Sequence, residues 1–246
     1  MAKQRIDQLL VERGLAESRT KAQALILAGL VYADDRRIDK AGHQLTADAA
    51  LTLKGRDHPW VSRGGVKLAH ALDHFRIDVS GRIALDIGAS TGGFTDVLLE
   101  RGARRVYAVD VGHGQLAWKL RQDPRVVVRE RVNARALTRA LVPESAEIIT
   151  CDASFIGLTT VLSAPLTLAA ERAILVALIK PQFEAGHEHV GKGGVVRDPA
   201  IHILVCERAA SWVGAQPGWT VEGIVESPIL GPEGNREFLL CAGRRG

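Results

Sequence analysis

The sequence predicts a doubly wound α/β sheet in its C-terminal part, preceded by a small α+β module. Seven strand-like segments after Val79 alternate with helix-like segments, which is typical of a mostly parallel sheet. Residues 1–58 differ, because two short amphipathic helices there precede short β-like pieces. A glycine-rich turn follows the first strand of the larger part, where this architecture binds nucleotide-like ligands.

The composition is that of an ordinary globular protein. The chain has 246 residues, of which 46% are hydrophobic and 24% charged, enough for one large domain or for one domain plus a small one. The longest apolar stretch, towards Ile179, is broken by Pro165, Glu171 and Arg172, so we expect no membrane-spanning segment. The N-terminus is charged and lacks the apolar core of a secretion signal, which favours a cytoplasmic location.

The cysteine spacing argues against two kinds of site, and the net charge weakly favours one kind of partner. Cys151, Cys206 and Cys241 are widely spaced and form no C-x-x-C pair. They support neither a disulfide framework nor a zinc site, and we expect no bound metal. The formal net charge of +4 leans mildly towards a polyanionic partner such as nucleic acid.

Residues 1–58 form the predicted small module. Two amphipathic helices are expected at 5–14 and 18–29, where apolar residues recur at helical spacing. Ser18 is a natural N-cap for the second helix, and Gly29 is a natural end. Two β-like pieces follow, at 30–35 and 50–55.

Residues 81–246 form the predicted main domain, and residues 59–80 form a linker and the first helix of that domain. A last strand that runs antiparallel to the others would complete a seven-stranded sheet. Strands are expected at 82–87, 105–110, 125–129, 146–151, 173–180, 219–226 and 236–241. Helices are expected near 91–101, 114–121, 134–141, 157–169 and 199–213.

The turn "ALDIGASTGGFTD", residues 84–96, indicates which ligand the main domain binds. It lacks the G-x-G-x-x-G spacing of dinucleotide sites and the G-K-[ST] ending of a phosphate loop, and Asp86 would repel a phosphate. A ligand with an adenosine and a sulfonium cation fits better, because Asp86 favours a cation and the glycines allow close backbone approach. The sequence therefore favours S-adenosylmethionine over a nicotinamide cofactor. The structural alternative is a tight turn without a ligand.

Two further residues extend this predicted cofactor site. Asp110 ends the second strand about twenty residues after the glycine turn, where an acid suits the hydroxyls of a ribose. Asn133, after the third strand, is a candidate for contact with the adenine edge. Its alternative role, at least as consistent with the sequence, is to cap the helix expected at 134–141.

Four charged residues lie where predicted elements begin or end. Asp152 ends the fourth strand and Lys180 the fifth, and parallel neighbours bring both to the carboxyl edge of the sheet. Glu237 begins the last strand, which starts at the same edge if it runs antiparallel beside the fifth. Lys67 lies in the helical stretch before the first strand and could close over the site. An ordinary salt bridge explains each residue alone, whereas the four in this order favour a catalytic set.

These four residues suit the methylation of a ribose hydroxyl. A hydroxyl is a poor nucleophile, so it must be aligned with the methyl–sulfur axis and must lose its proton. A free lysine has a pKa of about 10.4 and is protonated at neutral pH, but burial and a second cation lower the pKa of a lysine. Lys180, beside Lys67 and Asp152, is therefore the predicted general base. Pro181 then turns the chain away from the strand.

At these residues the chain resembles the haemolysin-A (TlyA) family of ribosomal-RNA 2′-O-methyltransferases, whose catalytic domain is similar to the RrmJ/FtsJ class. The segments that carry the resemblance are "RIDQLLVERGL", "SRTKAQALILAGLV", "VSRGGVKL", "LDIGASTGGFTD", "VDVGHGQL", "CDASFI", "LIKPQFE", "VGKGGVVRDP" and "GPEGNREFLL". The resemblance implies a Rossmann-like class I methyltransferase domain, S-adenosylmethionine as cofactor, and the catalytic set Lys67, Asp152, Lys180 and Glu237. The predicted cofactor contacts are Asp86, Gly88, Ala89, Ser90, Thr91, Gly92, Gly93, Phe94, Asp110, Val111, Asn133 and Asp152.

The same resemblance identifies the small module as an S4 RNA-binding domain. Its helix 18–29 would meet RNA phosphates at the N-terminus, where free backbone amides also favour anions. The family's substrate is a cytidine 2′-hydroxyl in ribosomal RNA, and the compact ends of this chain resemble members restricted to the large subunit. The predicted RNA-binding residues are Arg5, Arg19, Lys21, Arg63, Lys192 and Arg197.

The segment 186–199 is long and rich in glycine, and we interpret it as a mobile substrate loop that brings Lys192 and Arg197 to RNA. His187 and His189 predict no metal site, because no third ligand is near in sequence. Two other function classes stay open: a non-catalytic RNA-binding or ribosome-associated protein, and a haemolysin. Retention of all four charged positions argues against the first, and the absence of a signal or spanning segment argues against the second.

Overall fold

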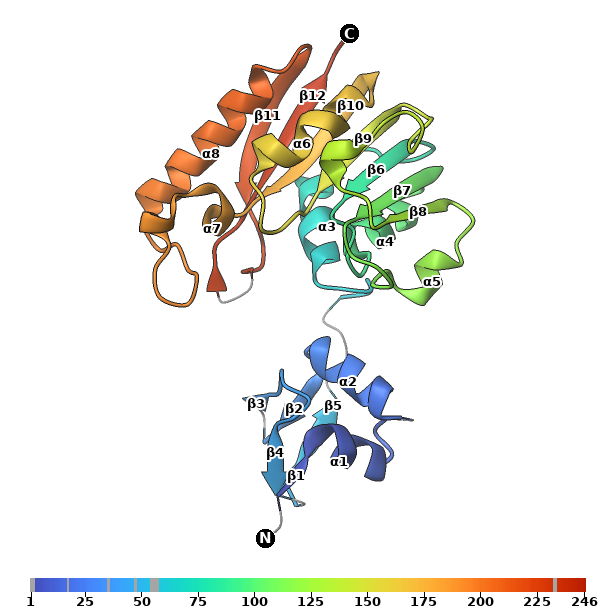
Figure 1. Ribbon diagram of the computed structural model, residues 1–246, viewed down its shortest axis with the longest axis vertical. Coiled ribbons are helices and arrows are strands. Elements are labelled where there is room, and N and C mark those ends of the chain that lie inside the picture. The colour runs from blue at the N-terminus through green and yellow to red at the C-terminus, as the bar shows by residue number, and fades with distance from the viewer. Residues whose placement is uncertain (1–2, 17, 35, 47, 54–57, 232–233) are drawn as a thin grey trace. The chain divides into compact units, whose positions relative to one another are not determined.

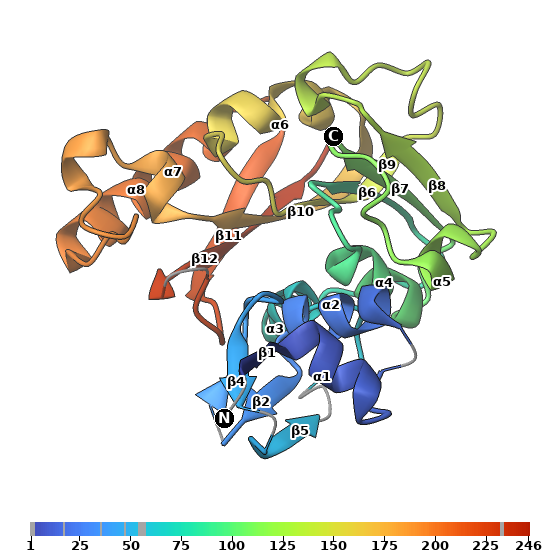
Figure 2. The same ribbon diagram turned by 60° about the horizontal axis from the view of Figure 1, so that its bottom comes forward.

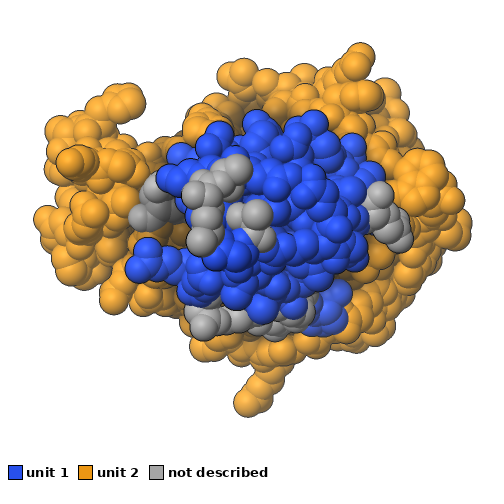
Figure 3. Space-filling model, turned by 90° about the horizontal axis from the view of Figure 1, so that it is seen from below, with its two compact units in different colours: residues 1–59 blue, residues 60–246 orange. Residues whose placement is uncertain are grey.

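The computed structural model describes residues 3–16, 18–34, 36–46, 48–53, 58–231 and 234–246 (Figure 1). The chain divides into two compact units, residues 1–59 and residues 60–246 (Figure 3). Residues 54–57, which include the end of the β-like piece expected at 50–55, lie outside the described residues. Each unit has its own hydrophobic core.

The first unit consists of two helices and two small antiparallel sheets. Strand β1 pairs with β4, and β2 lies between β3 and β5. Ser18 caps the second helix as expected, because its hydroxyl accepts a hydrogen bond of 3.2 Å from the backbone N–H of Lys21. The elements are β1 (Lys3–Arg5), α1 (Ile6–Glu12), α2 (Arg19–Leu27), β2 (Val31–Ala33), β3 (Arg36–Arg37), β4 (Gln44–Thr46) and β5 (Leu51–Leu53).

The second unit contains a seven-stranded sheet with the order β11-β12-β10-β9-β6-β7-β8. Neighbouring strands from β10 to β8 are parallel, and β12 is antiparallel to both of its neighbours. The prediction of a mostly parallel sheet with an antiparallel last strand is confirmed. The strands are β6 (Ile83–Ile87), β7 (Arg105–Asp110), β8 (Val126–Glu130), β9 (Ala146–Cys151), β10 (Ala169–Ile179), β11 (Trp219–Glu226) and β12 (Phe238–Arg244).

Helices cover both faces of this sheet (Figure 2). Apolar side chains of α3, α4 and α5 form the core on one face, and those of α6 and α8 form the core on the other. This sandwich of two helical layers around one sheet is the doubly wound architecture. The helices are α3 (Gly64–His74), α4 (Gly93–Glu100), α5 (Trp118–Arg121), α6 (Leu158–Thr167), α7 (Pro181–Glu184) and α8 (Pro199–Gly214), with short 3₁₀ turns η1 (Ala134–Ala136) and η2 (His187–His189).

Two expected helices are much shorter in the structure. The helix expected at 134–141 is only η1, which begins after Asn133 and is followed by extended backbone at Leu137. The helix expected at 114–121 is only α5, because Gly114 has a positive φ of 71° that a helix excludes. Strand β10, in turn, starts at Ala169 and so is longer than predicted.

Candidate active site

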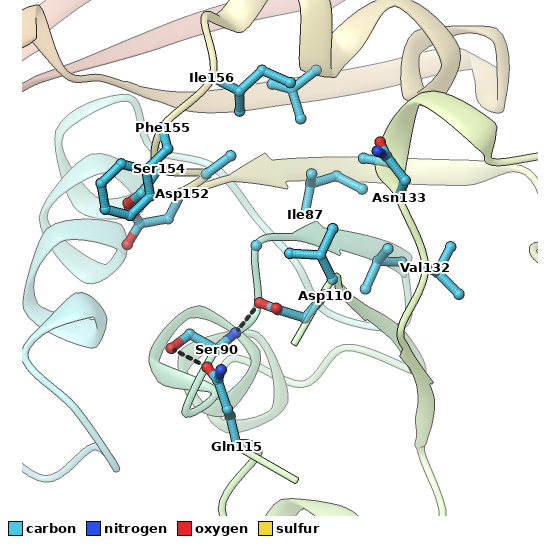
Figure 4. Close-up of a pocket in the computed structure, with 16 residues that line it drawn as sticks. Ile87, Ser90, Asp110, Gln115, Val132, Asn133, Asp152, Ser154, Phe155 and Ile156 are labelled. Carbon is cyan, nitrogen blue, oxygen red and sulfur yellow. Dashed lines mark hydrogen bonds between the residues drawn. The ribbon is translucent and has the colours of Figure 1, made fainter. Parts of the chain in front are cut away.

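A cavity of about 440 Å³ lies at the carboxyl ends of β6, β7 and β9 (Figure 4). Its volume is within the usual range of small-molecule sites. Most of its walls are apolar, and the polar side chains that reach it come from the loops after the strands. The lining residues are Ile87, Gly88, Ser90, Val109, Asp110, Val111, Gln115, Val132, Asn133, Ala134, Asp152, Ala153, Ser154, Phe155, Ile156 and Val161.

Asp110 organises the floor of this cavity. One carboxylate oxygen accepts a hydrogen bond from the backbone N–H of Ser90 (2.8 Å) and the other accepts one from Gly112 (2.6 Å). The Ser90 hydroxyl in turn donates to Gln115 Oε1 at 3.3 Å (Figure 4). Each Asp110 oxygen keeps acceptor capacity after these bonds, so the carboxylate can hold two ligand hydroxyls. Gln115, which the sequence did not point to, completes this group.

Gly88 is required where the β6–α4 turn passes the end of β9. Its φ is 77°, and a Cβ at this position would lie 3.0 Å from the backbone of Asp152 and Ala153. Only glycine accepts this approach without moving one of the two loops. The turn therefore holds the cavity wall directly against the segment that begins at Asp152.

Asp86 is not among the residues that line the cavity. Its carboxylate is fully buried and accepts hydrogen bonds from the hydroxyls of Thr95 (2.6 Å) and Thr150 (2.9 Å). Burial raises the pKa of Asp86 to about 6, against a usual value of 3.8. Its contact with the cofactor stays a prediction.

The other predicted cofactor residues divide into two groups. Those that line the cavity are Gly88, Ser90, Asp110, Val111, Asn133 and Asp152. Those that build the turn and the start of α4 without lining the cavity are Ala89, Thr91, Gly92, Gly93 and Phe94. Asn133 lines the cavity, and its Oδ1 accepts from the backbone N–H of Arg135 at 3.0 Å, so it caps η1. Its contact with the adenine edge stays a prediction.

The four predicted catalytic residues form two lysine–carboxylate pairs. Lys67 Nζ lies 2.5 Å from Glu237 Oε2, and Lys180 Nζ lies 2.6 Å from Asp152 Oδ1. The side chains of both lysines are only 9% exposed, and the Glu237 side chain is fully buried. Each cation is therefore covered, yet each has a partner that offsets the cost of burial.

The topology of the sheet explains why these pairs meet. Antiparallel β10 and β12 pair up to Ile179 and Phe238, so Lys180 and Glu237 are the next residues on each strand. Asp152 follows the end of β9, which lies on the other side of β10. Gly64, in the first turn of α3, is so close to Asp152 that a Cβ there would lie 3.7 Å from Oδ2, which brings the helix of Lys67 to the same edge.

Lys180 has two contacts beyond the Asp152 carboxylate. Its Nζ donates to Ser154 Oγ at 2.8 Å and to the backbone carbonyl of Asp152 at 3.3 Å. The contact with Asp152 Oδ1 is an ion pair whose angle is not that of a hydrogen bond. Ser154 was not predicted from the sequence, because nothing in its pattern separates it from other loop serines.

The segment 186–199 is tied to the chain just before Glu237. Asn235 accepts a hydrogen bond from the backbone N–H of Val196 (3.0 Å) and donates one to the carbonyl of Gly194 (2.9 Å). Lys192 and Arg197 are exposed on this segment. Arg63, also exposed, donates to the carbonyl of Leu230 at 3.1 Å. Contact of these three residues with RNA stays a prediction.

In the first unit, two of the predicted RNA-binding residues form ion pairs with the same buried acid, Asp7. Arg5 (3.0 Å) and Arg19 (3.1 Å) both contact Asp7 Oδ2, and Gln23 donates to the same oxygen at 3.0 Å. These partners hold the pKa of the Asp7 carboxyl well below its usual range, with the Arg5 hydrogen bond as the largest cause. Lys21 is exposed in the first turn of α2.

Within the described ranges, no three His, Cys, Asp or Glu side chains gather in a way that could hold a metal ion. In that same part of the chain, no helix is long and apolar enough to cross a membrane.

The strand order, the cavity at the carboxyl edge and the glycine turn define the second unit as a methyltransferase domain that uses S-adenosylmethionine. The model of the FtsJ-like methyltransferase family matches residues 60–244, and that of the S4 domain matches residues 4–51. The chain therefore belongs to the FtsJ-like methyltransferase family and carries an N-terminal S4 domain.

Three similar proteins extend over almost the whole chain. The 16S/23S rRNA (cytidine-2′-O)-methyltransferase TlyA of Mycobacterium tuberculosis is 49% identical over 240 residues, which cover 96% of this chain and 88% of that protein. Hemolysin A of Brachyspira hyodysenteriae is 40% identical over 236 residues, which cover 96% of this chain and 98% of that protein. A solved structure from Streptococcus thermophilus has a TM-score of 0.77 and 43% identity, and covers 100% of this chain and 90% of that one.

Proposed function

We propose that this protein transfers a methyl group from S-adenosylmethionine to the ribose 2′-hydroxyl of a cytidine in ribosomal RNA. The observation that carries the proposal is the meeting of two covered lysine–carboxylate pairs at the sheet edge that also holds the cavity. The name of the Mycobacterium tuberculosis relative supports the substrate. The S4 domain, with its exposed arginines, supports RNA as the partner.

The residues around the cavity fit the cofactor. Asp110 would hold the ribose hydroxyls of the cofactor, and the backbone of Gly88, which lines the cavity, would lie beside it. The apolar side chains of Val111 and Val132 would lie against the adenine, with Asn133 near its polar edge. When bound, S-adenosylmethionine supplies an electrophilic methyl group on a positively charged sulfur.

The charged pairs would then act on the RNA hydroxyl. Lys180, as a neutral amine, would take up the proton that the hydroxyl loses, and Asp152 would hold the lysine in place. Lys67, fixed by Glu237, would place a positive charge beside the oxygen as negative charge develops on it. General base catalysis of this kind contributes about 10²- to 10⁴-fold to a rate.

We place the reaction in the cytoplasm, with large-subunit RNA as the main substrate. Ribosomal RNA is assembled there, and the name of the Mycobacterium tuberculosis relative includes 23S RNA, the large-subunit molecule. The same name includes 16S RNA, so the small subunit is the second substrate to test.

Methyl transfer from radiolabelled S-adenosylmethionine to large subunits, small subunits and naked ribosomal RNA tests the proposal. We expect label on the ribose of a cytidine in large-subunit RNA. The variant Lys180→Ala should lower the rate by at least about 10³-fold, while calorimetry shows cofactor affinity within about twofold. The matched control is Lys119→Ala, which removes an exposed lysine paired with Asp96. RNA binding without transfer to any of the three substrates would favour the non-catalytic alternative.

A further inference from the structure

The amino group of Lys180 is surrounded by three oxygens. Asp152 Oδ1 lies 2.6 Å away, Ser154 Oγ 2.8 Å, and the Asp152 carbonyl oxygen 3.3 Å. A lysine ammonium carries three N–H groups and no lone pair. Two of these contacts are hydrogen bonds and the third, to Asp152 Oδ1, is an ion pair, so all three suit the protonated lysine. Either Asp152 oxygen would repel the lone pair of a neutral amine, so one contact must change before Lys180 can accept a proton.

Ser154 is the contact that can change. A neutral amine keeps two N–H groups, and both oxygens of Asp152 can only accept hydrogen bonds. A serine hydroxyl can accept or donate, so Ser154 can reverse its bond and donate to the nitrogen. The lone pair of neutral Lys180 therefore points at Ser154 Oγ.

Ser154 and Lys180 also differ in exposure. Lys180 is covered, with a side chain 9% exposed, whereas Ser154 is exposed and lines the cofactor cavity beside Asp152 and Phe155 (Figure 4). A ribose at this edge can therefore contact the serine hydroxyl, whereas the amine of Lys180 is covered.

We propose that Ser154 relays the proton of the RNA 2′-hydroxyl to Lys180, an inference that rests on the proposed function. The ribose oxygen forms its new bond to the methyl carbon, and the electron pair of the broken carbon–sulfur bond stays on sulfur. In the same step the ribose hydrogen passes to Ser154 Oγ, and the hydrogen of Ser154 passes to the lone pair of Lys180. Lys180 then loses this proton to water after the product leaves.

Two substitutions at position 154 test the relay in the full-length protein. Ser154→Ala should lower the single-turnover rate by about 100-fold or more, because it removes the proton carrier. Ser154→Thr keeps a hydroxyl and should stay within about tenfold of the unchanged protein. Cofactor affinity by calorimetry and melting temperature should be unchanged in both. The matched control is Ser163→Ala, an exposed serine of α6 whose hydroxyl donates to the Thr160 carbonyl of its own helix.

The pH dependence of the rate separates a relay from mere support of the lysine. If Ser154 relays, the plateau of the pH–rate profile of Ser154→Ala falls about 100-fold and no pH restores it. If Ser154 only holds Lys180, the midpoint of the profile moves and the plateau is retained, which would overturn the proposal. A retained rate in Ser154→Ala with a lost rate in Lys180→Ala would refute the relay and leave the proposed function intact.

Discussion

Two regions of this protein pair basic side chains with carboxylates, and they do so in opposite ways. In the first unit the acid is buried and the bases are open: Asp7 is fully buried, while Arg5 and Arg19 are 43% and 53% exposed. In the second unit the bases are covered, because Lys67 and Lys180 are each 9% exposed. The two kinds of ion pair therefore differ in the exposure of the cation.

The chemistry of each cation fits its exposure. An arginine stays charged under all ordinary conditions, and its planar guanidinium binds phosphates in two-pronged contacts, so it works best when open to a polyanion. A lysine can lose its proton, which a covered and fixed lysine needs for base catalysis. Covering a cation is expensive unless its partner is in place, so the lysine pairs depend strongly on their carboxylates.

The largest predicted effect comes from breaking a covered pair. Glu237→Gln leaves the ammonium of Lys67 without a charged partner and should lower the free energy of unfolding by about 3–5 kcal/mol, measured by urea denaturation. The matched control is Asp73→Asn in the exposed Arg101–Asp73 pair (2.8 Å), where the change should stay below about 1 kcal/mol.

The double variant Lys67→Met with Glu237→Gln tests whether the lost stability comes from the uncompensated cation. Removing both charges should recover most of the lost stability, because the uncompensated cation is gone, while methyl transfer stays lost. Equal destabilisation by Glu237→Gln and Asp73→Asn would show that coverage does not distinguish the two kinds of pair.

Asp86 is a buried carboxylate whose partners are two hydroxyls and not a cation of an ion pair. Its raised pKa predicts that the free energy of unfolding depends on pH. Its pKa of about 6 lies above the usual 3.8, so the folded protein holds the proton more tightly than the unfolded chain. Protonation of this carboxyl therefore stabilises the folded protein as the pH falls through 6. Above pH 6, the buried carboxylate destabilises the folded protein. Relative to Asp86→Asn, the unchanged protein should gain about 2 kcal/mol between pH 8 and pH 4.5 in urea denaturation.

A surface acid supplies the control of opposite sign. The pKa of Asp78 is lowered by hydrogen bonds from Ser80, chiefly from its backbone, so its stabilising contribution is lost as pH falls. Asp78→Asn should accordingly become more favourable relative to the unchanged protein at low pH. A pH-independent difference for Asp86→Asn would mean that Asp86 has an ordinary pKa in the folded protein.

The smallest predicted effect concerns the exposed arginines. Arg19→Gln keeps a hydrogen-bond donor for Asp7 but removes one charge, so RNA affinity should fall about five- to tenfold at low salt. The slope of log affinity against log salt concentration should decrease by about one, with methyl transfer at saturating RNA unchanged. Arg208→Gln, an exposed arginine of α8, is the charge-matched control. An unchanged slope for Arg19→Gln would exclude Arg19 from phosphate binding.

The carboxyl ends of β6, β7, β9 and β10 were predictable from the sequence to within about one residue, and so were the residues placed there. Lys180 and Asp152 each follow an apolar run, and a parallel sheet brings such ends to one edge. The orientation of Asp86 was not predictable, because all five residues of β6 are buried and no alternation marks which side faces the cavity. Ser154 and Gln115 lie in loops, where the backbone alone decides which polar side chain reaches the site.

The position of β12 determines when the sheet can be completed during synthesis of the chain. This strand is the last of the seven along the chain, yet it lies between β10 and β11. Until it is synthesised, both neighbours present open edges, and Lys67 lacks the partner that Glu237 provides. A nascent chain therefore acquires its fourth charged group only after the rest of the sheet exists. An enzyme proposed to modify ribosomes would thus stay inactive while a ribosome is still building it.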